Sequence, residues 1–265
     1  LHSLRRRQRQ MCIRDRYRPD LKGMNTTNQP GATGDGIKLA EALGAKLVDM
    51  DQVQVHPTVQ QDTPHAYLIG EAVRGEGAIL VNKHGDRFVN ELDTRKNVTA
   101  AIDGLKENGA YLIFDQGIRD RAKAVEFYDS IGLVHTGKSL DDLAGQLGFD
   151  AAALKKAVAD WNTAVADQND AAFNRTTGME RDISTAPFFA IHIAPAVHYT
   201  MGGIAINHKT EVLNDDGKAI KGLYAAGEIV GGLHGNNRIG GNSIAETVIF
   251  GRQAGEQVFN YINQK

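Results

Sequence analysis

The sequence predicts an α/β protein, and two observations carry this prediction: strand-like runs that are interspersed with helical segments, and glycine-rich turns between them. The 29 glycines among 265 residues fall in short clusters, as expected for tight turns and for backbone that approaches a ligand closely. The hydrophobic fraction of 42% and the charged fraction of 23% are ordinary for a globular protein. A chain of this length can bury a sizeable core and can form two domains.

The first third of the chain is predicted to alternate turns with short regular elements. Residues 24–36 are rich in turn formers and lead into a predicted helix at 37–43. A helix N-terminus that follows glycines suits an anionic or polar ligand. Strand-like runs follow at 46–48 and 53–55, and the second of them ends at His56.

A hairpin and an amphipathic helix are predicted in the middle of the chain. The apolar runs 78–81 and 87–90 flank a glycine-containing turn, as in a β-hairpin, and 111–114 is a further strand-like run. Ser139 followed by acidic residues is typical of a helix start. Residues 150–167 place four apolar side chains on one helical face, which predicts core packing: Leu154, Val158, Trp161 and Val165.

The last third is predicted to contain strands at 197–201, 204–206 and 222–226 and a closing helix at 243–262. The strand at 222–226 is followed by Gly227-Glu228, which puts a carboxylate at the carboxyl edge of a sheet, where α/β folds bind ligands. An acidic side chain at this position commonly accepts a hydrogen bond from a ribose hydroxyl. A surface glutamate without a ligand is the alternative interpretation.

The first sixteen residues differ in composition from the rest. They hold six arginines and one aspartate, in a chain whose formal net charge is −2. No aromatic or recognition pattern accompanies this basic segment, so a nucleic-acid-binding arm is not expected. No apolar stretch follows it either, which excludes a secretory signal of the usual form. We interpret residues 1–16 as a non-native tail that resembles translated adapter sequence.

Other global features exclude whole classes of site. The single cysteine, Cys12, excludes an internal disulfide framework and a cysteine-based metal site. His, Asp and Glu form no close-spaced cluster of the HExxH kind, so no bound metal is expected. There is no run of about 18 apolar residues that would predict a transmembrane helix. The compartment stays open between the cytoplasm and an exported location.

Glycine-rich surroundings single out Arg238 and His198. Arg238 is followed closely by Gly240-Gly241 and precedes the closing helix, whose unpaired N–H groups and positive dipole end favour negative charge. Its planar guanidinium suits a carboxylate. His198 shortly precedes Gly202-Gly203, a turn that can bring backbone close to a planar ring.

Six motifs then follow one another along the chain: HPTVQ, EAVRGEGAILVN, RFVNELDTR, HYTMGG, LYAAGE and HGNNRIGGN. In this order they resemble the fumarate reductase family of flavoproteins, in particular its soluble flavocytochrome-c-type and single-subunit members. The resemblance extends from about Tyr17 to the C-terminus. It implies an FAD-binding domain of the Rossmann-like kind with an inserted capping domain, and an oxidoreductase that acts on a CH–CH bond.

The resemblance implies a role for six residues near the substrate. Three match residues that hold the substrate's carboxylates: His56, His198 and Arg238. Arg95 matches the arginine that delivers a proton, and Glu71 and Arg74 match the relay that re-protonates it. The implied reaction is reduction of fumarate to succinate, with a hydride from flavin N5. Cations at both ends would fix the dicarboxylate. Proton delivery by an arginine rests on the resemblance, since a guanidinium with a pKa above about 12 is ordinarily a poor general acid.

The same resemblance implies non-covalently bound FAD. Five residues match FAD contacts: Asp35, Tyr199, Glu228, Ser243 and Ile244. The fumarate reductase type is expected to take a small dicarboxylate and an unidentified electron donor. No Gly-x-Gly-x-x-Gly follows a strand in this chain, so it is expected to be the C-terminal part of a longer enzyme and to be inactive alone. Any haem or FMN module would lie in the missing regions.

The sequence departs from the family pattern at Gly70. Respiratory members often carry a threonine there, which donates to a substrate carboxylate. Its absence leaves open the reduction of another 2-enoate such as urocanate. L-Aspartate oxidase, a ketosteroid dehydrogenase and an inactive FAD-domain fragment are further alternatives, although retention of the charged residues argues against a non-catalytic remnant.

The expected domain boundaries follow from the same resemblance. Residues 17–50 and 195–265 are expected to belong to the FAD-binding domain, and 51–194 to a capping domain that closes over the substrate. The substrate site is expected at the interface of the two domains, where closure would exclude water.

Overall fold

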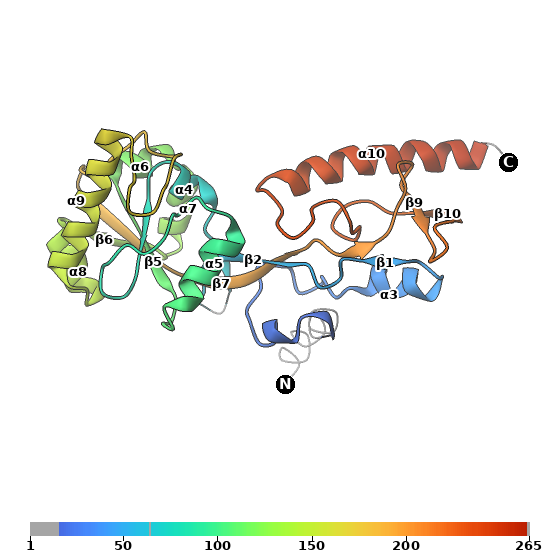
Figure 1. The fold of residues 1–265 in the computed structure, drawn as a ribbon, viewed down its shortest axis with the longest axis horizontal. Coiled ribbons are helices and arrows are strands. Elements are labelled where there is room, and N and C mark those ends of the chain that lie inside the picture. The colour runs from blue at the N-terminus through green and yellow to red at the C-terminus, as the bar shows by residue number, and fades with distance from the viewer. Residues whose placement is uncertain (1–15, 64, 264–265) are drawn as a thin grey trace. The chain divides into compact units, whose positions relative to one another are not determined.

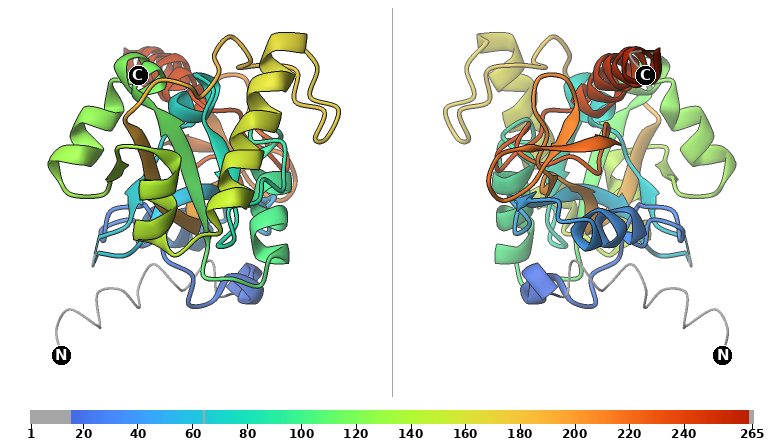
Figure 2. Two further views of the ribbon diagram at one scale, coloured as in Figure 1. Left: turned by 90° about the vertical axis from the view of Figure 1, so that its left-hand side faces the viewer. Right: turned by 90° about the vertical axis from the view of Figure 1, so that its right-hand side faces the viewer.

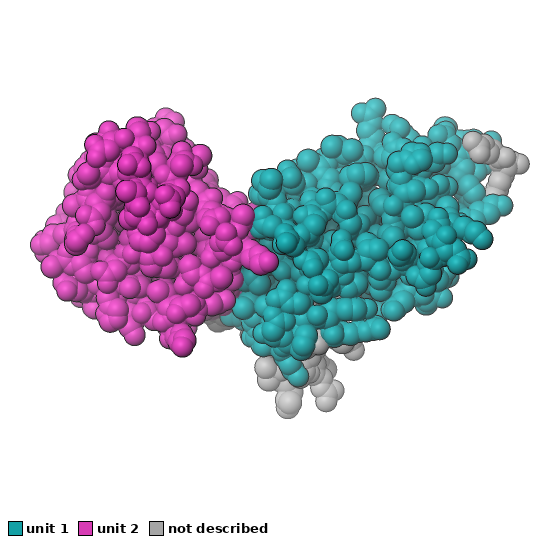
Figure 3. Space-filling view, in the orientation of Figure 1, with its two compact units in different colours: residues 1–55, 197–265 teal, residues 56–196 magenta. Residues whose placement is uncertain are grey.

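The computed structural model describes residues 16–63 and 65–263. The predicted tail lies outside these residues, apart from Arg16. The chain forms two compact units: unit 1 consists of Leu1–Val55 and Val197–Lys265, and unit 2 of His56–Ala196 (Figure 3). With 36% helix and 22% strand, the structure confirms the predicted α/β class. The assignment of an FAD-binding and a capping role to parts of the chain stays a prediction.

Unit 2 is built on a sheet in which β3, β2, β7, β5 and β4 are neighbours in this order, while β6 pairs with β7. Strand β5 is almost completely buried, because helices cover the sheet on both sides (Figure 2) and a strand covered on both faces is apolar along its length. Strands β2 and β7 each continue across the boundary into unit 1. The strands are β2 (Val53–Gln60), β3 (Tyr67–Leu68), β4 (Ile79–Val81), β5 (Ala110–Asp115), β6 (His135–Gly137) and β7 (Phe188–Thr200).

Six helices of unit 2 pack around this sheet, and four of them begin at a side chain that accepts a backbone N–H of the first turn. These capping residues are Thr94, Asp115, Ser139 and Asp150. Such caps satisfy donors that the helix itself leaves unpaired, and the cap at Ser139 confirms the predicted helix start. The helices are α4 (Glu71–Gly75), α5 (Arg95–Gly104), α6 (Gln116–Arg121), α7 (Ala124–Ser130), α8 (Leu140–Leu147) and α9 (Ala151–Asp167).

Helix α9 confirms the predicted amphipathic helix. Leu154, Val158 and Trp161 are buried in the core of unit 2, whereas Val165, at the end of the predicted stripe, is only partly buried. Trp161 is fully buried. The apolar period of the sequence therefore identified the face that packs on the sheet.

One strand prediction was wrong, and another strand proved to be longer than predicted. The predicted hairpin between 78–81 and 87–90 reduces to one bridge between Val81 and Arg87, and the partner of β4 is β5. Arg87 instead directs its guanidinium to Glu91 and Asp170 inside unit 2. The strand predicted at 197–201 is the end of β7, which begins at Phe188 and passes through Pro195.

Unit 1 places α3 (Asp35–Ala42) and α10 (Asn242–Asn263) on opposite sides of its short strands (Figures 1 and 2). Strands β1 (Leu47–Val48) and β8 (Gly203–Ile204) pair antiparallel, and β9 (Glu211–Leu213) pairs antiparallel with β10 (Ala219–Tyr224). A 3-10 turn, η1, spans Pro19–Leu21. The small core contains Ile37, Ala40, Ala45, Ile204 and Val212.

The glycine pair before β8 allows two backbones to touch. A Cβ atom on Gly202 would lie 2.0 Å from the carbonyl oxygen of Asp49, and one on Gly203 would lie 2.2 Å from that of Ile229. Only glycine permits these approaches. Chain packing within unit 1 therefore requires glycine at both positions of the turn after His198.

Helix α10 is unusual in its exposure. Of its described residues, only Glu246 is buried, while large apolar side chains along it are exposed: Ile244, Val248, Ile249, Phe259 and Ile262. Within residues 16–63 and 65–263, no helix is long and apolar enough to span a bilayer.

Candidate active site

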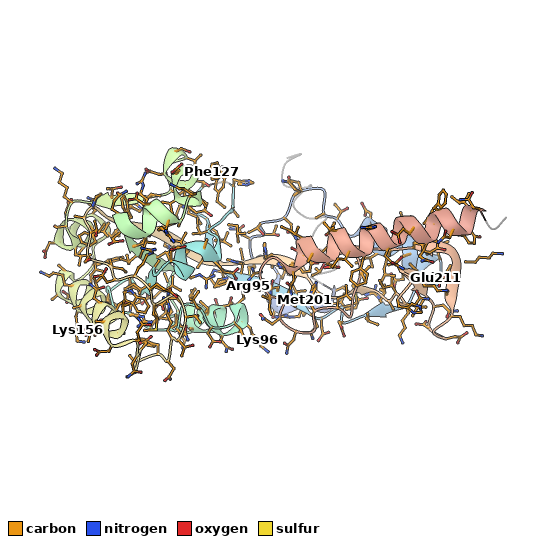
Figure 4. The ribbon with its side chains drawn as sticks, turned by 90° about the horizontal axis from the view of Figure 1, so that it is seen from above. Arg95, Lys96, Phe127, Lys156, Met201 and Glu211 are labelled. Atoms are coloured by element: carbon orange, nitrogen blue, oxygen red, sulfur yellow. The ribbon has the colours of Figure 1, made fainter. Side chains whose placement is uncertain are left out.

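In unit 2, Glu71 and Arg95 form a two-point ion pair. Arg95 is the first residue of α5, directly after the capping residue Thr94, and it is labelled in Figure 4. Its Nε donates to Glu71 Oε1 at 2.7 Å and its Nη2 donates to Oε2 at 3.0 Å. The guanidinium fork is matched by the carboxylate, an arrangement that fixes orientation as well as charge. The fold thus brings together two residues that the sequence separates by α4 and β4.

Arg74 lies behind this pair, on the same face of α4 as Glu71. Its Nη2 is 3.9 Å from Glu71 Oε1, and its Nη1 donates to the carbonyl oxygen of Glu91 at 2.5 Å. The Arg74 side chain is almost fully buried. Burial lowers the pKa of Arg74 to about 10, although the Glu71 carboxylate opposes this shift. The structure therefore places the two predicted relay residues together, with Arg74 the less strongly held cation.

The depressed pKa of Arg74 predicts an observable titration. The Cζ resonance of Arg74 is expected to titrate near pH 10 in carbon NMR, whereas a guanidinium in water ionises above about pH 12. The substitution Glu71→Gln is expected to move this midpoint to lower pH, because Glu71 stabilises the cation. Between the two pKa values the unfolded chain binds the proton more tightly, so this group makes the folded state more stable as pH rises through that window.

The matched control for this titration is Glu256→Gln, which removes an exposed carboxylate in unit 1. It is expected to leave the Arg74 midpoint in place. A midpoint above pH 12 in the unsubstituted protein would show that Arg74 is hydrated and would contradict the prediction.

His56 lies on β2 and presents one protonated nitrogen toward Glu71. Its Nδ1 accepts a hydrogen bond from the backbone N–H of Thr58 at 3.3 Å. A backbone N–H can only donate, so in the neutral ring Nδ1 is the acceptor and Nε2 carries the proton. His56 Nε2 is 3.9 Å from Glu71 Oε1, and the ring is buried. His56, Glu71, Arg74 and Arg95 thus form one group within unit 2.

In unit 1, Arg238 lies over an aromatic ring. Its Cζ atom is 4.2 Å from the centroid of the Tyr199 ring, a cation–π contact. The Nη1 of Arg238 donates to the carbonyl oxygen of Ile239 at 3.2 Å, and its own carbonyl accepts from Gln54 Nε2 at 2.8 Å. These contacts fix the backbone and the plane of the guanidinium. His198, on β7, has its Nδ1 at 2.8 Å from the hydroxyl of Thr27.

Glu246 is a buried carboxylate beside Tyr199 that sequence reasoning missed. Its Oε2 accepts from the Tyr199 hydroxyl at 2.7 Å and lies 2.8 Å from His234 Nε2. Burial and this bond to Glu246 raise the pKa of Tyr199. Glu246 sits in a helix whose other described residues are not buried, so no sequence signal marked it.

A pocket of about 390 Å³ opens in unit 1 at the N-terminus of α3. Asp35 and Glu228, two of the predicted FAD contacts, line it together with Gly34, Gly36 and Thr200. Gly34 has a positive φ of 72°, which only glycine adopts readily. Thr200 donates to Glu228 Oε1 through its backbone N–H at 2.9 Å and its hydroxyl at 3.3 Å. Desolvation raises the pKa of Glu228 despite these bonds.

The remaining predicted site residues lie elsewhere in each unit. Ser243 and Ile244 are in the first turn of α10, where Ile244 is exposed. Neither lines the pocket at α3. Gly70 is the N-cap residue of α4, directly before Glu71. Within the part of the chain that the structure describes, no group of His, Cys, Asp or Glu is arranged to hold a metal ion.

Comparison with known proteins identifies the family. The family model described as FAD binding domain matches residues 6–244. The chain is 52% identical over 242 residues to an NADH:fumarate oxidoreductase of Klebsiella pneumoniae (strain 342), an alignment that covers 91% of the chain and 26% of that protein. It is 45% identical over 251 residues to a probable fumarate reductase of Shewanella frigidimarina (strain NCIMB 400), covering 94% of the chain and 42% of that protein.

A solved structure gives the same result. The open conformation of a flavocytochrome c3 fumarate reductase superposes with a TM-score of 0.73 at 44% identity, over 96% of the chain and 44% of that structure. The chain spans between 26% and 44% of the length of these three proteins. The predicted resemblance is confirmed: the chain is similar to fumarate reductases and belongs to the FAD binding domain family.

Proposed function

We propose that this chain carries the catalytic residues of an FAD-dependent reduction of fumarate to succinate. The observation that carries the proposal is the two-point pair between Arg95 and Glu71, with Arg74 buried behind it. Two guanidinium groups share one nearby carboxylate, so this group holds an excess of positive charge. An excess of positive charge beside a proton-transferring pair suits a dianionic substrate that must also gain a proton.

The residues of unit 1 fit the pyrophosphate, ribose or flavin parts of FAD. The pocket at the N-terminus of α3 combines a helix end, glycines without side chains and the acceptor Glu228, which are features that bind dinucleotides. Asp35, Tyr199, Glu228, Ser243 and Ile244 are the residues proposed to contact FAD. When bound, FAD supplies the hydride of the reaction.

Three side chains are proposed to bind the carboxylates of the substrate. His56 offers its Nε2–H, and Arg238 offers a guanidinium whose plane is held over Tyr199. His198 is the third, oriented by Thr27. A charged group that is positioned in advance does not have to reorganise when the substrate arrives, so it stabilises charge that develops during the reaction.

Arg95 is proposed to give the proton and Glu71 to return one. Reduction of the double bond needs one hydride at one alkene carbon and one proton at the other. The N–H of Arg95 would supply that proton and leave a neutral guanidine, which Glu71 and Arg74 would re-protonate from water. Arg95 is the first residue of α5, and its two hydrogen bonds to Glu71 connect the proposed donor directly to the proposed relay.

Gly70 is proposed to loosen substrate selection, and this can be tested by restoring a hydroxyl. The substitution Gly70→Thr should be tolerated, because the backbone is extended (φ −62°, ψ 156°) and a Cβ would meet only the Tyr128 hydroxyl at 3.7 Å. A hydrogen bond to a charged group contributes about 1.5–3 kcal/mol, so KM for fumarate is expected to fall about tenfold in steady-state assays. Gly70→Ala adds the Cβ without the hydroxyl and should leave KM near its original value. An equal fall in both variants would contradict a hydroxyl contact.

One experiment tests the proposed function. The full-length protein is reconstituted with FAD, separated from unbound flavin, and assayed with reduced viologen against fumarate and urocanate. Stoichiometric flavin and rapid oxidation of the viologen by fumarate support the proposal. Rapid turnover of urocanate without turnover of fumarate would replace it by a urocanate reductase.

A further inference from the structure

Unit 2 contains a buried cluster of four charged side chains that the proposed reaction does not use. Arg87 donates to both oxygens of Glu91, at 2.7 and 2.8 Å, and to Asp170 Oδ2 at 2.7 Å. Arg175 Nη1 donates to Glu91 Oε2 at 3.0 Å. All four side chains are at most 6% exposed. Two cations and two anions balance in charge. Taking four charges out of water is still unfavourable unless well-placed hydrogen bonds compensate for the lost hydration.

Arg175 is the most constrained member of the cluster, because all five of its side-chain N–H groups have an acceptor. Four of these acceptors are backbone carbonyl oxygens and the fifth is Glu91 Oε2. The carbonyl acceptors are Thr177 at 3.0 Å, Ala78 at 3.0 Å, Gly178 at 2.8 Å and Arg74 at 2.6 Å. Arg175 therefore joins its own loop, the start of β4 and the last turn of α4.

Arg74, Glu91 and Arg175 form a closed ring of hydrogen bonds. Arg175 Nη2 donates to the carbonyl oxygen of Arg74, and Arg74 Nη1 donates to the carbonyl oxygen of Glu91 at 2.5 Å. The side chain of Glu91 then accepts from Arg175. The ring holds Arg74 at two points, its backbone and its guanidinium.

We propose that Glu91 and Arg175 are positioning residues for the proton relay. Glu71 and Arg74 are on one face of α4, so a ring that fixes Arg74 also fixes the carboxylate that receives Arg95. Glu91 and Arg175 act through Arg74. This inference rests on the proposed function, because the relay has a role only if a proton is delivered.

The test uses Arg175→Lys, which keeps the charge and removes the fork. The substitution removes the hydrogen bond to the Arg74 carbonyl oxygen and opens the ring. Arg74 is then expected to approach water, and its Cζ titration is expected to move from about pH 10 toward the value in water. In the FAD-loaded protein kcat with fumarate is expected to fall about tenfold while KM stays the same, as for loss of an interaction made only in the transition state. Asp115→Asn is the matched control, since Asp115 is a buried carboxylate of the same unit that caps α6 and binds the amides of Ser184 and Thr185.

The outcomes separate positioning from stability. An unchanged Arg74 titration and kcat in folded Arg175→Lys would overturn the proposal, and so would equal changes in Asp115→Asn. Glu91→Gln keeps the shape of the side chain and should act in the same direction as Arg175→Lys. If both variants failed to fold, the ring would serve stability and the proposal would be wrong. If the unsubstituted protein did not reduce fumarate, the proposed function would fail, and the Arg74 titration would still show whether the ring holds that side chain.

Discussion

Replacing Arg95 by lysine is expected to lower kcat for fumarate reduction by about 10²- to 10⁴-fold, the contribution typical of a positioned general acid. Lysine keeps the positive charge but cannot donate two parallel hydrogen bonds to Glu71. The substitution therefore removes both the fixed orientation of the side chain and the guanidinium N–H that is proposed to give the proton. The effect on KM should be small, because the substrate's carboxylates are proposed to be held by other side chains. Steady-state assays with reduced viologen on the FAD-loaded protein measure both quantities.

The control for this experiment is the adjacent residue. Lys96→Gln removes a positive charge at the next position of α5, where the side chain is exposed, and it is expected to leave kcat unchanged. Loss of activity in both variants would point to general electrostatics near α5. Retention of most of the rate by Arg95→Lys would exclude Arg95 as the proton donor.

The largest expected change in stability follows from removing Glu91. In Glu91→Ala the guanidinium groups of Arg87 and Arg175 stay buried and lose their shared carboxylate. Breaking a buried ion pair in this way costs about 3–5 kcal/mol of the free energy of unfolding. Urea unfolding followed by circular dichroism measures this loss as a lower midpoint.

An exposed ion pair in the same unit provides the comparison. Asp160 pairs with Lys156 on the outer face of α9, and both side chains are more than half exposed. Asp160→Ala is expected to shift the midpoint little, because exposed pairs contribute little. Equal shifts for Glu91→Ala and Asp160→Ala would mean that water reaches the Glu91 cluster.

Periodic patterns and capping residues predicted the local structure well. The stripe of α9 and the cap at Ser139 depend on neighbours within one or two helical turns, so the sequence contains the whole signal. The hairpin at 78–90 failed because Arg87 turns into the interior to reach Glu91 and Asp170. Pairing of that kind depends on side chains far apart in the sequence, and a turn signal does not reveal it.

In the candidate site, too, the sequence motifs predicted individual residues but not the contacts between residues far apart in the chain. The motifs predicted Glu71 and Arg95, and the structure adds that they meet through two hydrogen bonds. Glu246 and Arg175 had no motif or spacing to mark them. Their importance comes from burial, which is a property of the folded chain: a glutamate in a helix and an arginine in a loop are ordinarily exposed.

Two arginines of the buried charged cluster, Arg87 and Arg175, also surround the protein's single tryptophan. The chain has a single tryptophan, Trp161, and the guanidinium groups of Arg175 and Arg87 lie over its ring at 4.3 and 4.9 Å. Its fluorescence therefore reports on one place in unit 2, with an emission set by a dry, cation-rich environment. If the cluster loosened, water would reach the indole and the emission of Trp161 would shift to longer wavelength. The wavelength of this emission can therefore be used to follow whether Arg175 still holds Arg74.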